Sequence, residues 1–203
     1  PTISFESGYI ELLKKIKEKN IPLIYLKEKD KIETNFEKIF VLHPSPGKFK
    51  TDNQNSLVLK ILKNNLENFK NVQIIHISGF LDFKKVEKEY EKLILSHKIF
   101  PYFQEIEKLY TISDLVISRA GAMTISELIH FKKPAILIPL PTAAELHQNW
   151  NAEFLKKYNC VEVIYQRKNW EEKLYKKIIE FINNKSLLYK MSLGYKDIPK
   201  PQT

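Results

Sequence analysis

A turn of small residues, SRAGAMTISE at positions 118–127, holds the side chains whose types and spacing best suit binding of an anion. Gly121 can adopt a positive φ, and its alanine neighbours keep the turn narrow. The first N–H groups of a helix have no intrahelical partner, so Met123 and Thr124 would present theirs to a phosphate. Arg119 would add a charge-assisted contact to that phosphate. The turn therefore predicts a phosphate site.

Glu127 lies one helical turn beyond Met123 and Thr124. Its carboxylate would repel a phosphate but suits a pair of sugar hydroxyls, such as a ribose diol. Thr124 and Glu127 also have the spacing of a capping box, which is needed only to begin a helix. The residues alone leave ligand binding and simple helix capping both open.

A second polar loop, PLPTAAELHQNWN, follows the apolar run at 135–138. His147 and Gln148 lie where the next helix is expected to begin. Amide side chains both donate and accept hydrogen bonds, which suits recognition of hydroxyl groups. The alternative is that Asn149 and Asn151 merely cap and solvate that helix.

The other chemistry-bearing residues are isolated in the sequence. His43, His97 and His130 have no partner at metal-ligand spacing, and we expect neither a metal nor a cofactor. His76 lies within an apolar run and is expected to be a core histidine with satisfied hydrogen bonds. The single cysteine, Cys160, excludes an internal disulfide and is expected to be a small buried side chain.

These residues lie between segments whose patterns alternate between strand and helix. Strands are expected at residues 2–5, 21–26, 38–42, 72–78, 97–100, 114–118, 135–140 and 161–165, the first two more weakly. Helical patterns separate the strands, and such alternation implies a parallel sheet with helices on both faces, an α/β Rossmann-like fold. Ligands of such sheets bind beyond the carboxyl ends of the strands. Both polar loops follow strands, so we expect them to form one site.

The composition and net charge of the chain indicate which kinds of molecule it binds. The chain has 203 residues, 43% of them hydrophobic, and a formal net charge of +9. We expect an anionic small molecule and an anionic membrane surface as partners. Nucleic acid is not expected, because the basic residues do not interleave with aromatic residues in a nucleic-acid-binding motif.

The segment SDLVISRAGAMTISELIHFKKPAILIPLPTAAELHQNWNAEFL closely resembles the donor-binding domain of the MurG family. These bacterial transferases, of the two-domain GT-B type, attach N-acetylglucosamine (GlcNAc) from UDP-GlcNAc to lipid-linked muramyl-pentapeptide. Three motifs carry the resemblance: SRAGA-x-T-x-SE, KPAILIPLP and HQ-x-x-NA. It extends from about residue 99 to residue 164.

The resemblance implies roles for individual residues. Phe103 would frame the uracil through its backbone, and Ile106 would lie near the phosphates. The turn from Ala122 to Thr124 would approach the diphosphate and the GlcNAc, and Glu127 would take the ribose hydroxyls. The substrate-binding residues expected in all are Phe103, Ile106, Arg119, Gly121, Ala122, Met123, Thr124, Glu127, His147 and Gln148.

The first 50 residues depart from the family pattern. The family opens with a glycine-rich loop facing the acceptor's diphosphate, whereas TISFESGYIELLKK contains no such loop. HPSPGKFKTDNQN stands where a second glycine-rich loop is expected. We expect residues 51–203 to form the UDP-GlcNAc donor domain and residues 1–50 to be a remnant of an acceptor domain that is largely absent, through omitted or truncated segments.

The resemblance implies the donor half of an inverting, metal-free GlcNAc transferase of peptidoglycan synthesis, peripheral at the cytoplasmic face of the bacterial plasma membrane. No catalytic base is identifiable, so these 203 residues alone are expected to bind the donor without turnover. The alternative is a non-catalytic UDP-sugar-binding subunit that needs a separate membrane-anchored partner chain. A nucleotide-sugar epimerase of the same architecture is a third, less favoured reading.

Overall fold

The computed structural model describes residues 37–43, 54–141 and 146–199. The chain divides into two units, Pro1–Glu37 and Lys38–Thr203. The first strand of the sheet, β1 (Lys38–His43), belongs to the second unit and lies in the middle of the sheet. The boundary expected between residues 50 and 51 therefore falls inside the sheet-forming unit, which already begins at Lys38.

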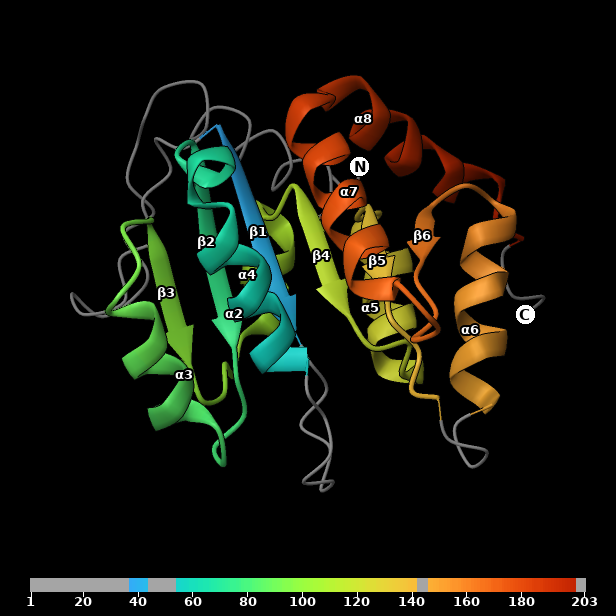
Figure 1. Cartoon of the computed structure of the whole chain (residues 1–203). Helices are drawn as coiled ribbons and strands as arrows, with labels where there is room; N and C mark the ends of the chain where they lie inside the picture. Colours follow the sequence, from blue (N-terminus) through green and yellow to red (C-terminus); the bar gives the residue numbers. More distant parts are fainter. Residues whose placement is uncertain (1–36, 44–53, 142–145, 200–203) are drawn as a thin grey trace, which may run out of the picture. The chain divides into compact units, whose positions relative to one another are not determined.

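Six parallel strands form one sheet in the order β3-β2-β1-β4-β5-β6 (Figure 1). The strands after β1 are β2 (Val72–Ile77), β3 (His97–Phe100), β4 (Leu115–Ser118), β5 (Ala135–Leu137) and β6 (Val161–Val163). This is the strand order of a doubly wound dinucleotide-binding sheet. The expected Rossmann-like parallel sheet is confirmed.

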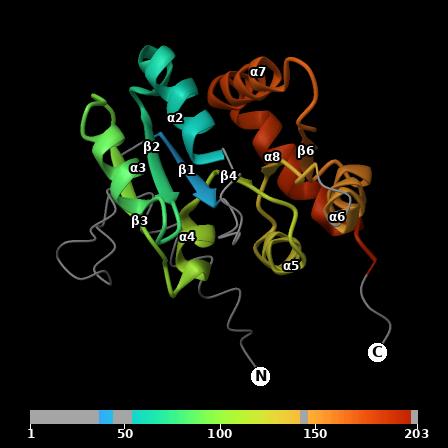
Figure 2. The same ribbon diagram turned by 60° about the horizontal axis from the view of Figure 1, so that its bottom comes forward.

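Helices cover both faces of the sheet, as Figure 2 shows. They are α2 (Gln54–Asn64), α3 (Phe83–Tyr90), α4 (Ile106–Ile112), α5 (Ala122–Phe131), α6 (Leu146–Lys157), α7 (Trp170–Asn183) and α8 (Lys185–Gly194), with short 3-10 turns at Leu66–Phe69 and Tyr195–Asp197. Helices α2, α3 and α7 lie on one face, and α4 and α5 lie on the other. No helix in the described part of the chain is long and apolar enough to cross a bilayer.

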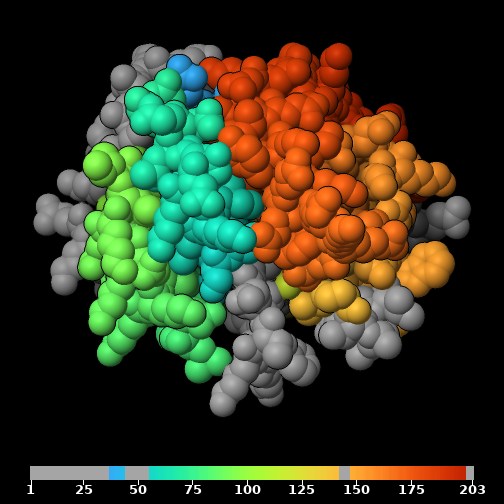
Figure 3. Space-filling model, viewed as in Figure 1, coloured from blue at the N-terminus to red at the C-terminus, as the bar shows by residue number. Residues whose placement is uncertain are grey.

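The alternation of side chains along the central strands explains why helices pack on both faces of the sheet. Phe40 and Leu42 of β1 pack in the main core with the apolar sides of α2, α3, α7 and α8. Ile39 and Val41 are equally buried but are directed to the opposite face. In the space-filling view of Figure 3, side chains of α2, α3, α7 and α8 cover the first face almost continuously. Burial on both faces is why these strands are continuous apolar runs.

The chain reverses its direction of winding between β1 and β4. From β1 the sheet grows outward through β2 and β3, and then β4 is added on the other side of β1. Helices on the two sides diverge at such a switch point and leave a crevice beyond the carboxyl ends of the two strands. His43 at the end of β1 pairs in register with Ser118 at the end of β4. The turn singled out in the sequence thus begins at the switch point.

Candidate functional site

The turn after β4 leads directly into helix α5, but not in the conformation expected. Gly121 is the N-cap of α5, with φ −66° and ψ 152°. This is extended backbone that any residue adopts, so the positive φ open to a glycine is not used here. A Cβ at Gly121 would meet only Thr124 Oγ1, at 4.0 Å. What the glycine contributes is open space beside the turn, which is what close approach of a ligand requires.

The helix start excludes the capping-box reading. Helix α5 begins at Ala122 and Thr124 already lies within its first turn, so Thr124 is not the N-cap. The first intrahelical bond joins Ile125 N to Gly121 O at 3.0 Å. The N–H groups of residues 122–124 therefore precede the hydrogen-bond ladder, at the positive end of the helix dipole. Met123, 78% exposed, lies at this surface.

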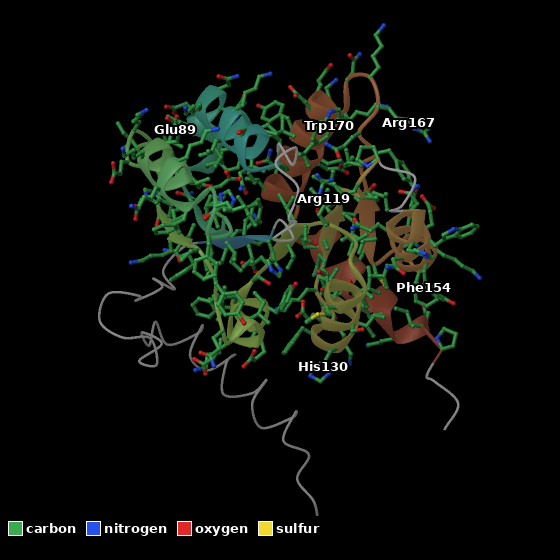
Figure 4. The ribbon with its side chains drawn as sticks, turned by 90° about the horizontal axis from the view of Figure 1, so that it is seen from below. Glu89, Arg119, His130, Phe154, Arg167 and Trp170 are labelled. Atoms are coloured by element: carbon green, nitrogen blue, oxygen red, sulfur yellow. The ribbon has the colours of Figure 1, made fainter. Side chains whose placement is uncertain are left out.

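Arg119 is directed into the protein. It is 1% exposed, and its Nη1 donates to Ile138 O at 2.8 Å and to Gln166 Oε1 at 2.9 Å. Figure 4 shows Arg119 inside the molecule, whereas Arg167 projects outward. The guanidinium thus ties the end of β4 to the segments that follow β5 and β6. The side chain is buried, so the direct phosphate contact expected from the sequence would require the guanidinium to become accessible.

Two side chains from the start of α6 hold the backbone of Ala120. Gln148 Oε1 accepts from Ala120 N and from Leu140 N, both at 3.3 Å. Asn151 Nδ2 donates to Ala120 O at 3.0 Å. Both backbone polar groups of a fully buried residue are therefore satisfied by α6. The sequence suggested for Asn151 only a capping and solvating role, although the i, i+3 spacing in HQ-x-x-N places it on the same helix face as Gln148.

The other expected residues lie on the same edge of the sheet. Phe103 follows the end of β3 and packs edge-on against Phe100, with ring centroids 4.9 Å apart. Ile106 is the first residue of α4. His147 is exposed in the first turn of α6. The structure thus brings the turn and Gln148 into direct contact, and places Phe103 and Ile106 at the end of the outer strand β3.

Beneath the first turn of α5 lies a polar cluster from three elements, here called the Tyr110 cluster: His43, Tyr110, Thr124 and Glu127. The Tyr110 hydroxyl lies 3.5 Å from His43 Nδ1 and interacts with Thr124 and Glu127. Sequence reasoning missed Tyr110 and treated His43 as isolated. A tyrosine at an apolar helical position gives no signal that separates it from core packing.

The electrostatics of the cluster follow from its burial. Burial raises the pKa of the Glu127 carboxyl, a hydrogen bond from Tyr110 lowers it, and the charge of Glu107 raises it. The net pKa is raised. Burial lowers the pKa of His43 to about 4, so its imidazole is neutral. Among the described residues, Glu127 Oε2 is buried with no hydrogen-bond partner.

This arrangement suits a ligand with both a diphosphate and a diol. Free N–H groups at a helix start bind an anion through fixed dipoles, and a carboxylate one turn further binds vicinal hydroxyls. Within the described ranges, no group of three or more histidine, cysteine, aspartate or glutamate side chains is placed to hold a metal ion.

Comparisons with solved structures support the fold. MurG of Acinetobacter baumannii superposes with a TM-score of 0.69 at 24% identity, over 81% of this chain and 48% of that one. A Staphylococcus aureus structure described as an MnaA–UDP co-structure superposes with a TM-score of 0.56 at 13% identity, over 76% and 40%. Both likenesses concern the fold alone.

Comparisons of sequence go further. A protein of Elusimicrobium minutum named UDP-N-acetylglucosamine--N-acetylmuramyl-(pentapeptide) pyrophosphoryl-undecaprenol N-acetylglucosamine transferase is 34% identical over 172 residues, which are 84% of this chain and 46% of that protein. The protein of the same name from Thermodesulfovibrio yellowstonii is 38% identical over 130 residues, 64% of this chain and 36% of that one. The chain thus spans less than half the length of these relatives.

The model of one protein family covers most of the chain. It matches residues 49–200, which include both polar loops, Gln148 and Asn151 of α6, and three of the four residues of the Tyr110 cluster. The chain belongs to the family of the glycosyltransferase family 28 C-terminal domain.

Proposed function

We propose that this domain binds UDP-GlcNAc as the donor half of a GlcNAc transferase that acts in peptidoglycan synthesis. The observation that carries the proposal is the start of α5 at the switch point, with three free N–H positions and Glu127 one turn further on. The names of the family relatives support GlcNAc transfer to a muramyl-pentapeptide carrier. Transfer would be inverting and without a metal, as the resemblance implies.

In this proposal the ligand lies across the ends of β3, β1 and β4. The diphosphate accepts from the N–H groups of residues 122–124, the ribose diol donates to Glu127, and the uracil lies at the backbone of Phe103 with Ile106 close to the phosphates. His147 and Gln148 flank the sugar. Arg119 acts from beneath by holding the turn, so the anion is stabilised mainly by helix N–H groups.

Calorimetric titration with UDP-GlcNAc tests the proposal. Wild-type protein should bind, and Glu127→Ala should weaken binding by about 1–3 kcal/mol, roughly 5- to 150-fold in Kd, because a charged hydrogen-bond acceptor is lost. Glu172→Ala, an exposed glutamate of α7 paired with Lys176, is the matched control and should bind as wild type does. Wild-type protein that fails to bind UDP-GlcNAc would refute the donor site.

Catalysis needs the acceptor hydroxyl held about 3–3.5 Å from the sugar carbon. We propose that these 203 residues alone do not provide that second surface. When the 203-residue chain is mixed with UDP-GlcNAc and a lipid-linked muramyl acceptor, the release of UDP is expected to stay at the background rate. Turnover at an ordinary enzymatic rate would show that the acceptor site is present in this chain.

The alternative is a UDP-sugar-binding subunit that is completed by a separate, membrane-anchored partner chain. The match to a C-terminal domain model alone, over residues 49–200, is compatible with it. Both proposals share the donor site. Sequencing the complete reading frame separates them, since only the first requires an acceptor domain encoded in the same gene.

We also propose that the protein associates peripherally with the cytoplasmic face of the plasma membrane. The +9 formal charge and the undecaprenol carrier in the relatives' names support this. Each lysine close to an anionic bilayer contributes about 1 kcal/mol, screened over a Debye length. Co-sedimentation with phosphatidylglycerol vesicles should therefore fall steeply as salt rises, and phosphatidylcholine vesicles should bind little. Absence of binding at low salt would contradict the proposal.

A further inference from the structure

The Tyr110 cluster lies directly beneath the proposed ribose site, and its central hydroxyl is out of reach of any ligand. Tyr110 is 0% exposed, and its ring stacks on Phe131 of α5, with centroids 5.9 Å apart and planes 15° from parallel. Its hydroxyl lies 3.5 Å from His43 Nδ1. A group this deeply buried can influence binding only through the residues that it holds.

The charges around the hydroxyl determine which way it donates. Burial, and then the charge of Glu127, raise the pKa of Tyr110 well above its usual value, so the phenol keeps its proton. Of its neighbours, Glu127 is an acceptor when ionised, and His43 is held neutral by burial. A carboxylate is the stronger acceptor of the two.

We infer that Tyr110 is a positioning residue, whose hydroxyl fixes the Glu127 carboxylate in the orientation that receives the donor's ribose diol. The inference rests on the proposed function. The observations behind it are the contacts that one buried hydroxyl makes. They reach His43 at the end of β1, Thr124 in the first turn of α5, and Glu127 in its second turn. Three elements that meet at the switch point are thus joined through a single oxygen.

Preorganisation is the physical advantage of such an arrangement. A free glutamate samples several rotamers, and ordering it on binding reduces affinity. A donor from the buried side removes much of that cost before the ligand arrives. The benefit is felt only by a ligand that uses Glu127, which separates positioning from a general contribution to folding.

The test compares two ligands and two tyrosine variants. Tyr110→Phe keeps the ring and its stacking on Phe131 but removes the hydroxyl. Its Kd for UDP-GlcNAc should rise about 5- to 10-fold, the size of effect expected for the loss of one ordinary hydrogen bond. Its Kd for the 2′,3′-dideoxyribose analogue of UDP-GlcNAc should match that of wild type. Tyr90→Phe removes another buried tyrosine hydroxyl that faces a histidine, His76, and should change neither Kd.

A double variant completes the test. In a Glu127→Ala background, Tyr110→Phe should cause no further loss of affinity, because the two act through one contact. Equal losses for both ligands, additive losses in the double variant, or an unchanged Kd for UDP-GlcNAc would each overturn the inference. Wild-type protein that binds neither ligand would instead overturn the proposed function, and the inference with it. Thermal unfolding of each variant confirms that folded protein is compared.

Discussion

Replacing Gly194 by alanine is expected to lower the free energy of unfolding by about 3 kcal/mol or more. Gly194 is the last residue of α8 and packs against the turn that follows α6. A Cβ there would overlap the carbonyl oxygen of Tyr158 and lie 3.3 Å from Cys160 Sγ. Relief requires backbone to move, and this backbone is anchored by Cys160 N donating to Leu155 O at 3.2 Å.

The neighbouring residue restricts movement from the other side. The Tyr195 hydroxyl donates to Lys133 O at 2.6 Å, so a shift of the end of α8 would strain this part-buried hydrogen bond. For a domain of this size the expected loss lowers Tm by roughly 6–12 °C. Gly121→Ala is the matched control, because the nearest atom to its added methyl is 4.0 Å away, and its Tm should stay close to that of wild type. Equal Tm values for Gly194→Ala and wild type would show that the close approach is absent.

The sequence predicted the structure best where the pattern is local, within one strand or helix. The continuous apolar runs predicted parallel strands buried on both faces, and the six strands expected from residue 38 onward are present. The strands expected at residues 2–5 and 21–26 lie outside the described residues. His76 was predicted to be a core histidine with satisfied bonds, and it is fully paired in the interior. The strand order was beyond such reasoning, because the pairing of β1 with β4 joins segments more than 70 residues apart.

The candidate site shows the same difference between local features, which the sequence predicts, and long-range contacts, which it does not. The turn and the HQ pair were located by residue type and spacing, and the structure brings them together through Ala120 and Gln148. The orientation of Arg119 was not predictable, because its partners Ile138 and Gln166 lie 19 and 47 residues further along the chain. An arginine at the end of a strand looks the same in sequence whether it faces a ligand or the interior.

Lowering the pH from 7 to 5 is expected to reduce the free energy of unfolding by about 4 kcal/mol, mainly through two buried histidines. Burial lowers the pKa of His76 to about 3 and that of His43 to about 4, from a usual value of 6.5. In the unfolded chain both return to about 6.5 and take up a proton below that pH. Each therefore weakens folding by roughly 2 kcal/mol at pH 5.

The hydrogen bonds of His76 explain why the folded state rejects the proton. Asn55 Nδ2 donates to Ser78 O at 3.0 Å and to Asp82 Oδ2 at 2.9 Å, which turns its Oδ1 toward His76 Nε2 at 2.8 Å. Nε2 must then carry the hydrogen, leaving Nδ1 to accept from the Tyr90 hydroxyl at 3.1 Å. A second proton on Nδ1 would remove the only acceptor role of the ring and leave a charge inside the core.

The sign of the pH effect follows from the direction of these pKa shifts. A histidine whose folded pKa is depressed contributes its full stability above pH 6.5 and loses it as the pH falls toward its folded value. Urea unfolding at pH 7, 6 and 5 should therefore show a slope approaching two protons below pH 6. His76→Gln should be less stable at every pH but lose only about 2 kcal/mol between pH 7 and 5, because one titrating group is gone. Tyr90→Phe removes the hydroxyl that contacts His76 but keeps the histidine, so it should retain the wild-type slope. An unchanged slope in His76→Gln would show that another group takes up the proton.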